Sequence, residues 1–425
     1  QTDVTDLSSR VNIIDSSMGT IIVGNNSIKS NTDQTNVNSD ESISLGKESG
    51  NSGQGSKTIA IGSSAGKNNQ GNNSIAIGLA AARGVQGTSS IAIGNQAGLD
   101  NQKNDSIAIG SFAGTTQQEN FAIAIGFSAG KEQQLANSIA MGTAAGQKQQ
   151  KSNCIAIGLA AGFENQDTES IAIGNEAGKT NQGSESIAIG RYAGQNNQKS
   201  ESIAIGNSAG NQNQQAESIA IGNSAGNQNQ QAESIAIGNS AGSTDQSNNS
   251  IAIGFGAALG SQGTSSIAIG NEAGNNTQSN YGVAIGFEAG KSNQEAHSIA
   301  IGSNAGSTNQ QTNSIAIGNQ AGLDNQKNYS IAIGSLAGSE NQKTNSIAIG
   351  LGAGFKDQQA NSIAIGFEAG NTDQGSNSIA IGPNAGKNDL CNNCIAIGPN
   401  AGNQNELAHS IYLDTGATNL DNIGG

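Results

Sequence analysis

The sequence predicts an all-β fold, a parallel β-solenoid (β-roll) built from sixteen-residue coils, and three observations carry that prediction. The motif Ser-Ile-Ala-Ile-Gly returns at every sixteenth position with small variations, giving 23 full copies over residues 42–409 without an insertion or deletion. Within the motif, branched apolar residues alternate with small ones, which is typical of a strand. A glycine follows the strand in all 23 copies, and glycine suits a turn with positive φ or a close approach of two backbones.

Composition excludes an ordinary globular core. The 425 residues contain 61 Gly and no Trp, and hydrophobic residues reach only 34%, so the chain must bury little surface per residue in many equal steps. The net charge of −14 argues against nucleic acid and against anionic membrane surfaces as partners, because both require a concentrated basic patch. No apolar run approaches the roughly 20 residues that span a bilayer, so we expect no membrane insertion of this segment.

The first element of each coil is the strand at positions 1 to 5 of the repeat, where Ser42 is position 1 of the first copy. Positions 2 and 4 are almost always Ile, as in Ile267 and Ile269, and they share one face of the strand. We expect these isoleucines to form the core. The other face carries Ser, Ala and Gly, with Ala at position 3 in 22 of 23 copies.

The uniform Ser-Ala-Gly stripe predicts contact with another chain, because a solvent-facing strand would tolerate polar variety. We therefore expect a parallel homotrimeric fibre that associates through this stripe, with Ala268 and Ala284 among the contacts. The alternative is a flat stripe that stays exposed to solvent.

The rest of the coil has its own regular positions. Position 8 is Ala in 22 of 23 copies and position 9 is Gly in 21, with Ala82 and Ala258 as exceptions, which favours a demand for small volume over left-handed φ at position 9. Position 13 is Gln in 21 of 23 copies, which predicts a ladder of stacked amides at the strand spacing of about 4.8 Å. The alternative is a surface Gln copied by tandem duplication. A coil has room for two strands of about four residues and two turns.

The flanks depart from the repeat. Residues 1–41 carry an imperfect copy, Thr20 to Gly24, outside the sixteen-residue register, and we interpret this segment as an N-terminal cap or attachment segment. Residues 410–425 begin with Ile411 and Leu413 in register, which indicates a last rung followed by an exit segment. The solenoid of 23 coils between them should be a rod on the order of 110 Å long.

The motif Ser-Ile-Ala-Ile-Gly-x-x-Ala-Gly, over residues 42–413, resembles the head repeat of YadA-like trimeric autotransporter adhesins. It also resembles the related AIGxxAG repeats of viral and phage fibre proteins. The resemblance implies a parallel β-roll assembled as a trimer and displayed outside the cell or on a virion. The repeat of the adhesin heads is usually shorter than the sixteen-residue repeat of this chain.

No catalytic, cofactor-binding or metal-binding constellation is expected. The two histidines, His297 and His409, stand seven coils apart at position 16, so neither can complete a triad or a zinc site. Cys391 and Cys394 have the spacing of half a metal knuckle without a second half, and we interpret Cys394, like Cys154, as a small residue at position 1. Scattered acids such as Glu169 come and go between copies, which is typical of a solvated rim.

The sequence therefore predicts a non-catalytic structural module of an extracellular or virion-surface fibre or adhesin, which presents variable turn residues for attachment. Its expected partners are further copies of itself and a glycan or protein receptor on a host surface. Two alternatives stay open. One is an ice- or crystal-binding solenoid, in which the Ser-Ala-Gly stripe would match a lattice, and the other is a glycan-binding protein of the tailspike kind.

Overall fold

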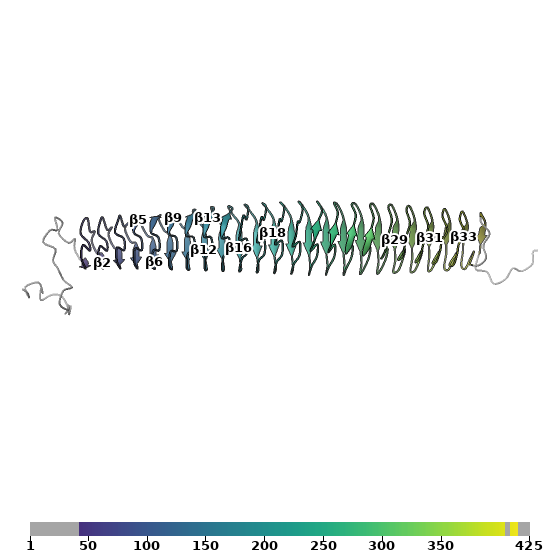
Figure 1. The fold of residues 1–425 in the computed structure, drawn as a ribbon, viewed down its shortest axis with the longest axis horizontal. Helices are drawn as coiled ribbons and strands as arrows, with labels where there is room; N and C mark the ends of the chain where they lie inside the picture. Colours follow the sequence, from purple (N-terminus) through teal and green to yellow (C-terminus); the bar gives the residue numbers. More distant parts are fainter. Residues whose placement is uncertain (1–41, 404–408, 415–425) are drawn as a thin grey trace, which may run out of the picture.

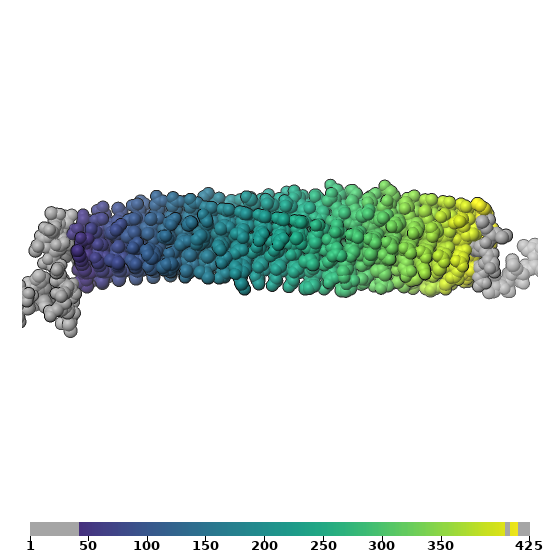
Figure 2. Space-filling model, in the orientation of Figure 1, coloured from purple at the N-terminus to yellow at the C-terminus, as the bar shows by residue number. Residues whose placement is uncertain are grey.

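The computed structural model describes residues 42–403 and 409–414, and it confirms the predicted parallel β-solenoid. The chain winds along a straight axis, one coil per repeat, and forms a rod with the described ends of the chain at opposite ends of the stack (Figure 1). The coils lie against one another without a break along the visible face of the rod (Figure 2). No helix occurs in the described parts of the chain.

One side of every coil is formed by positions 1 to 5, and we call this side the isoleucine wall. Its strands make one parallel 24-stranded sheet in which each strand pairs with the equivalent residues of the next repeat, for example Ile267 with Val283 and Ala268 with Ala284. The strands are β1 (Ile43–Leu45), β2 (Ile59–Ile61), β3 (Ile75–Ile77), β4 (Ile91–Ile93), β6 (Ile107–Ile109), β8 (Ile123–Ile125), β10 (Ile139–Met141), β12 (Ile155–Ile157), β14 (Ile171–Ile173), β16 (Ile187–Ile189), β17 (Ile203–Ile205), β18 (Ile219–Ile221), β19 (Ile235–Ile237), β20 (Ile251–Ile253), β22 (Ile267–Ile269), β24 (Val283–Ile285), β26 (Ile299–Ile301), β28 (Ile315–Ile317), β29 (Ile331–Ile333), β30 (Ile347–Ile349), β31 (Ile363–Ile365), β32 (Ile379–Ile381), β33 (Ile395–Ile397) and β34 (Ile411–Leu413).

The opposite side, at positions 10 to 13, is the glutamine wall, and its pairing is interrupted. It holds a six-stranded and a four-stranded parallel sheet, joined and continued by isolated bridges such as Gln212 with Gln228. The strands have two or three residues, fewer than the four expected. They are β5 (Asp100–Gln102), β7 (Thr116–Gln118), β9 (Glu132–Gln134), β11 (Lys148–Gln150), β13 (Glu164–Gln166), β15 (Thr180–Gln182), β21 (Ser261–Gln262), β23 (Thr277–Gln278), β25 (Ser292–Gln294) and β27 (Thr308–Gln310).

The interior of the solenoid corrects the predicted core. Ala268 at position 3 and Ser266 at position 1 are 0% exposed, whereas Ile267 and Ile269 are half-buried and lie on the outside of the isoleucine wall. The same pattern runs along the chain, with buried alanines at positions 3 and 8 in continuous clusters. The prediction that the isoleucines form the core of a single chain is therefore wrong.

At position 9 the interior has no room for a residue larger than alanine. A Cβ added to Gly290, at position 9, would lie 2.6 Å from Oε1 of Gln294 and 3.2 Å from the Cβ of Ala284 on the isoleucine wall. Position 9 also has left-handed backbone conformation, with φ of +52° at Gly290 and +46° at both Ala82 and Ala258. The expectation that this position needs small volume rather than left-handed φ is wrong, because it requires both.

The glycine that ends each strand of the isoleucine wall meets both conditions named for it. Gly286 has φ of +133°, and a Cβ added there would lie 2.6 Å from the carbonyl oxygen of Gly302 in the next coil. Such a φ is open to glycine alone, and the contact is with backbone that cannot move aside. This position therefore fixes the close stacking of successive coils.

The predicted glutamine ladder is confirmed, and it lies inside the solenoid. Gln310 is 0% exposed, and its Nε2 donates to Oε1 of Gln326 at 3.1 Å and to the carbonyl of Ile299 on the opposite wall at 2.7 Å. Such bonds join consecutive glutamines without a gap from Gln86 to Gln166 and from Gln246 to Gln374. Each amide thus ties the two walls of its coil together and ties that coil to the next.

The isoleucine wall ends at the C-terminal side with one irregular rung. Strand β34 pairs with β33, which places Tyr412 opposite Ala396, and Tyr412 packs against the end of the buried alanine cluster. Leu390, buried at position 13, takes the place of glutamine and ends the ladder after Gln374. The predicted cap in residues 1–41, its imperfect copy at Thr20 to Gly24 and the exit segment beyond residue 414 lie outside the described residues.

Candidate functional site

The outer side of the isoleucine wall is a continuous apolar surface, which we call the isoleucine face. It consists of the side chains at positions 2 and 4 in every coil, half-buried or exposed, with Ile157 37%, Ile301 36% and Ile397 40% exposed. At about 4.8 Å per coil, the stripe is two side chains wide and on the order of 110 Å long. An apolar patch of this size exceeds the few hundred Å² that monomeric proteins expose.

The Ser-Ala-Gly stripe cannot be the contact surface between chains. Its alanines and serines point into the coil and are fully buried within one chain, where Ser266 Oγ donates to the carbonyl of Gly263 at 2.7 Å. The predicted association through Ala268 and Ala284 is wrong for this reason. The face that remains available on this wall is the isoleucine face.

The outer side of the glutamine wall carries a second ladder at position 12, whose side chains are half-buried or exposed and which sequence reasoning missed. Asn293 donates from Nδ2 to Oδ1 of Asn309 at 3.1 Å, and the series continues through Asn325 and Asn341 to the carboxylate of Asp357. A second such series runs from Asn165 to Asp245. The signal for both in the sequence was the recurrence of Asn at position 12. The structure gives this position a left-handed backbone, which Asn tolerates better than most residues.

Two shallow grooves follow these outer ladders along the rod axis. One has a volume of about 430 Å³ and lies between position 12, with Asn309 and Asn325, and position 14, with Glu295, Gln311 and Lys327. The other has a volume of about 390 Å³ and has the same walls within residues 149–200. Both are lined by polar side chains and glycine, so the glutamine wall offers hydrogen-bonding sites where the isoleucine wall offers apolar surface.

One corner of the coil concentrates the ion pairs. Lys291 at position 10 contacts Glu288 of its own coil at 2.9 Å and Glu272 of the preceding coil at 2.7 Å. The hydrogen bond from Lys291 is the main cause that holds the pKa of Glu288 below its usual value, and the hydrogen bond to Glu272 is the main cause that raises the pKa of Lys291. Lys67 with Glu48 and Lys387 with Glu368 repeat the contact between coils.

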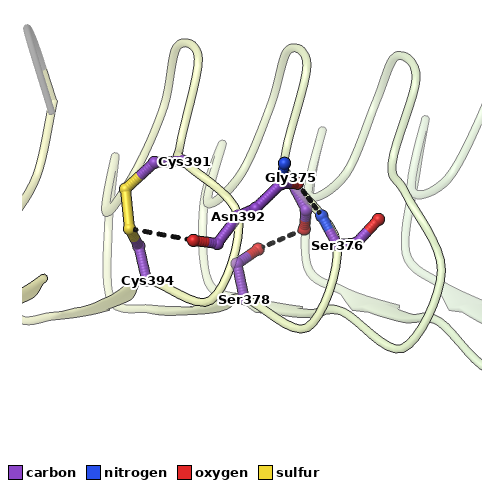
Figure 3. The surroundings of a disulfide bond; sticks show 6 residues. All are labelled: Gly375, Ser376, Ser378, Cys391, Asn392 and Cys394. Atoms are coloured by element: carbon purple, nitrogen blue, oxygen red, sulfur yellow. Dashed lines mark hydrogen bonds between the residues drawn. A yellow bond between two sulfur atoms is a disulfide. The ribbon is translucent and has the colours of Figure 1, made fainter. Parts of the chain in front are cut away.

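The cysteines at the C-terminal end form a disulfide, contrary to the interpretation of Cys394 as a small residue at position 1. Cys391 at position 14 is bonded to Cys394 at position 1, with 5.4 Å between the Cα atoms (Figure 3). In the preceding coil the same two positions are joined by a hydrogen bond from Ser378 Oγ to the carbonyl of Gly375 at 2.6 Å (Figure 3). The disulfide therefore replaces a turn-closing hydrogen bond in the coil where the glutamine ladder ends.

The remaining chemical candidates do not come together. His297 stacks on Tyr281, with 4.8 Å between ring centroids. Cys154 is buried, and burial raises the pKa of its thiol. Within the described residues no three His, Cys, Asp or Glu side chains are grouped as metal ligands, and no helix there is long and apolar enough to cross a membrane.

The fold and its two outer faces define a class: a fibrous β-solenoid with one apolar and one polar long side. Residues 296–321 and 374–385 match the model of the YadA head domain repeat, and both stretches contain the motif of the isoleucine wall. The resemblance to YadA-like head repeats is thereby confirmed, and it suggests a surface fibre module of adhesin type. No relation to the viral repeats accompanies this match, and among curated proteins none matches the chain.

Proposed function

We propose that this chain forms the rigid, non-catalytic shaft of a cell-surface attachment fibre, in which three parallel copies pack through their isoleucine faces. The observation that carries the proposal is the unbroken pair of isoleucine columns on the outside of one wall. In a parallel assembly these columns face one another, and the glutamine walls, with their variable residues, remain on the outside for attachment.

The energetics of the coil support association. The interior of one chain contains alanine, serine, glycine and glutamine, which bury little apolar area against an ordering cost of about 1–2 kcal/mol per residue. The isoleucines are the largest apolar side chains that recur in every coil, and they are withdrawn from water only when another chain covers them. Three copies is the number proposed because the head repeats that this chain resembles are assembled as trimers.

One further feature supports a surface location, and another weighs against an alternative function. A disulfide persists in oxidising surroundings such as the cell exterior, and the chain has one between Cys391 and Cys394. The ice- or crystal-binding alternative depended on the Ser-Ala-Gly stripe meeting a lattice, and that stripe is buried inside the solenoid. No observation favours a virion over a cell surface.

The test is the oligomeric state by sedimentation velocity and mass photometry at micromolar concentration. The wild-type chain of 42.4 kDa should have three times that mass. Substituting Ile109, Ile221 and Ile333, seven coils apart on the isoleucine face, by Asp should give monomers, because each places a charge in a contact without water. Matched controls place Asp at position 12 of the same coils, on the opposite wall, through Gln117→Asp, Asn229→Asp and Asn341→Asp. A monomeric wild type, or an isoleucine variant that stays trimeric, would refute the proposal.

A further inference from the structure

We propose that the two grooves beside the outer asparagine ladders are binding sites for a neutral, extended glycan with β-1,4-linked pyranose units. The inference deepens the proposed attachment role, on which it rests, by naming the class of receptor. Each groove is formed by a single chain, so binding can be tested whatever the oligomeric state.

The hydrogen-bonding capacity of the ladder is the first step of the argument. Asn309 accepts one bond from Asn293 and donates one to Asn325, at 3.1 and 3.2 Å. A primary amide has two N–H donors and two lone pairs on its oxygen, so each rung has one donor and one acceptor left for a ligand. A sugar hydroxyl both donates and accepts, and the ladder therefore matches a row of hydroxyl groups.

The ladder also holds these groups in fixed orientation. The position-12 asparagines have left-handed backbone, with φ of +54° at Asn309 and +56° at Asn325, and every amide in a series donates towards the C-terminal end of the rod. Long polar side chains usually lose rotamer freedom when they bind, at about 0.5–1.5 kcal/mol each. Here the neighbouring rungs already restrict that freedom.

The spacing between successive coils favours an extended glycan. The groove at residues 277–327 runs along the axis over four coils, and successive coils are about 4.8 Å apart. A β-1,4-linked pyranose chain advances by nearly the same distance per sugar, so its units stay in register with the rungs over four coils. An α-1,4-linked chain coils and loses this register. A groove of about 430 Å³ lies within the usual range of ligand sites, roughly 300–1,000 Å³.

The charges that line the grooves disfavour a polyanion as the ligand, and the pairing of the backbone disfavours an extended peptide. Glu295 and Lys327 line the same groove. In the other groove Lys151 is paired with Asp167 at 3.0 Å, and Lys199 is the one further charged side chain. Neither site therefore presents a concentrated charge for a polyanion. An extended peptide would need the free edge of a sheet. The backbone groups of these coils are paired along the axis instead, as in the bond from Gln311 N to the carbonyl of Gln326.

The experiment measures binding of cellohexaose and chitohexaose to the full chain by isothermal titration calorimetry, with maltohexaose as the α-linked comparison. The variant carries glycine at four rungs, two in each groove: Asn165→Gly, Asn181→Gly, Asn309→Gly and Asn325→Gly. Glycine retains the left-handed backbone and removes the amide. We expect binding of at least one β-linked probe, no binding of maltohexaose, and at least a roughly tenfold weaker affinity in the variant.

A matched control tests the same change elsewhere. Position 16 also carries stacked, exposed asparagines with left-handed φ. The control replaces Asn137, Asn153, Asn345 and Asn361 by Gly. This change breaks two ladder hydrogen bonds, of 3.2 and 3.1 Å, that lie outside the grooves. The control should bind like the wild type. Three results would overturn the inference: failure of both β-linked probes to bind, equal binding of maltohexaose, or unchanged affinity in the position-12 variant. A wild type that is monomeric and binds would refute only the proposed trimer.

Discussion

The two walls of the solenoid follow different rules, although they belong to the same coils. The isoleucine wall is a single sheet of 24 strands whose inward and outward residues both repeat along its length, whereas the glutamine wall breaks into sheets of six and four strands. The inward glutamine of that wall repeats strictly, but its outward asparagine at position 12 recurs in only part of the coils. An inward residue must repeat because the next coil stacks on it. An outward residue has no such need within one chain, and the strictly repeated outward isoleucines are the surface that the proposed assembly would cover.

The largest expected effect comes from substitutions on the inner side of the isoleucine wall. Replacing both Ala268 and Ala284 by Arg should disrupt the central coils by more than about 4 kcal/mol, since the arginines would be buried charges without space. Limited proteolysis followed by mass spectrometry should locate new cleavage near these coils.

The matched change on the outside is Ile267→Asp together with Ile285→Asp. These side chains are half-buried on the isoleucine face, so the coils should remain resistant to protease while association is weakened. Protease resistance of the arginine variant, or cleavage of the aspartate variant at the same site, would mean that the two sides of the wall have been assigned the wrong way round.

The glutamine ladder inside the solenoid can be tested by removing one of its amides. Gln310→Ala removes the amide that donates to Ile299 O and Gln326 Oε1 and accepts from Gln294. Buried groups left without partners cost about 1–3 kcal/mol each, so hydrogen exchange in these coils should speed up by an amount equivalent to about 3 kcal/mol. Gln311→Ala, at the next position, should stay within about 0.5 kcal/mol of the wild type, and equal effects of the two changes would contradict an interior ladder.

Removal of the disulfide tests whether it stabilises the last coils, where the glutamine ladder is absent. Cross-linking residues so close in sequence stabilises by roughly 2 kcal/mol in the chain-entropy treatment. Cys391→Ser with Cys394→Ser should therefore make the C-terminal coils more sensitive to protease by about that amount, and reducing agent should do the same to the wild type. Cys154→Ser is the control, because that thiol is unpaired. If reduction leaves the C-terminal coils of the wild type unchanged, the disulfide has no stabilising role.

Much of this architecture could be predicted from the sequence. The sixteen-residue period, the strand and its glycine stop, and the stacked amide at position 13 depend on local patterns, and the structure has them all. Which face of the strand lies inside could not be read from alternation alone, since a period of two is the same for either choice, and the usual preference of isoleucine for interiors pointed the wrong way. The missed signal was the combination of Ala at position 3, Ala at position 8 and Gly at position 9, which together leave no room for isoleucine inside. The disulfide was missed because the turn that brings positions 14 and 1 together is visible only in the fold.

The smallest expected effect concerns the corner between the walls, where charge rather than packing joins the coils. Glu288 has a pKa below its usual value in the folded chain, mainly through the hydrogen bond from Lys291, so its contribution to stability is present above the usual titration range of Glu and is lost as the pH falls through the lowered pKa. Lys291 and its two partners are 25–32% exposed, which limits each pair to a few tenths of a kcal/mol. Lys291→Met should therefore lower the unfolding temperature slightly at pH 7, and the two proteins should converge as the pH falls through the lowered pKa of Glu288. Addition of salt at pH 7 should narrow the difference in the same way. A difference that persists unchanged at acidic pH would mean that Lys291 acts through the packing of its methylene groups and not through its charge.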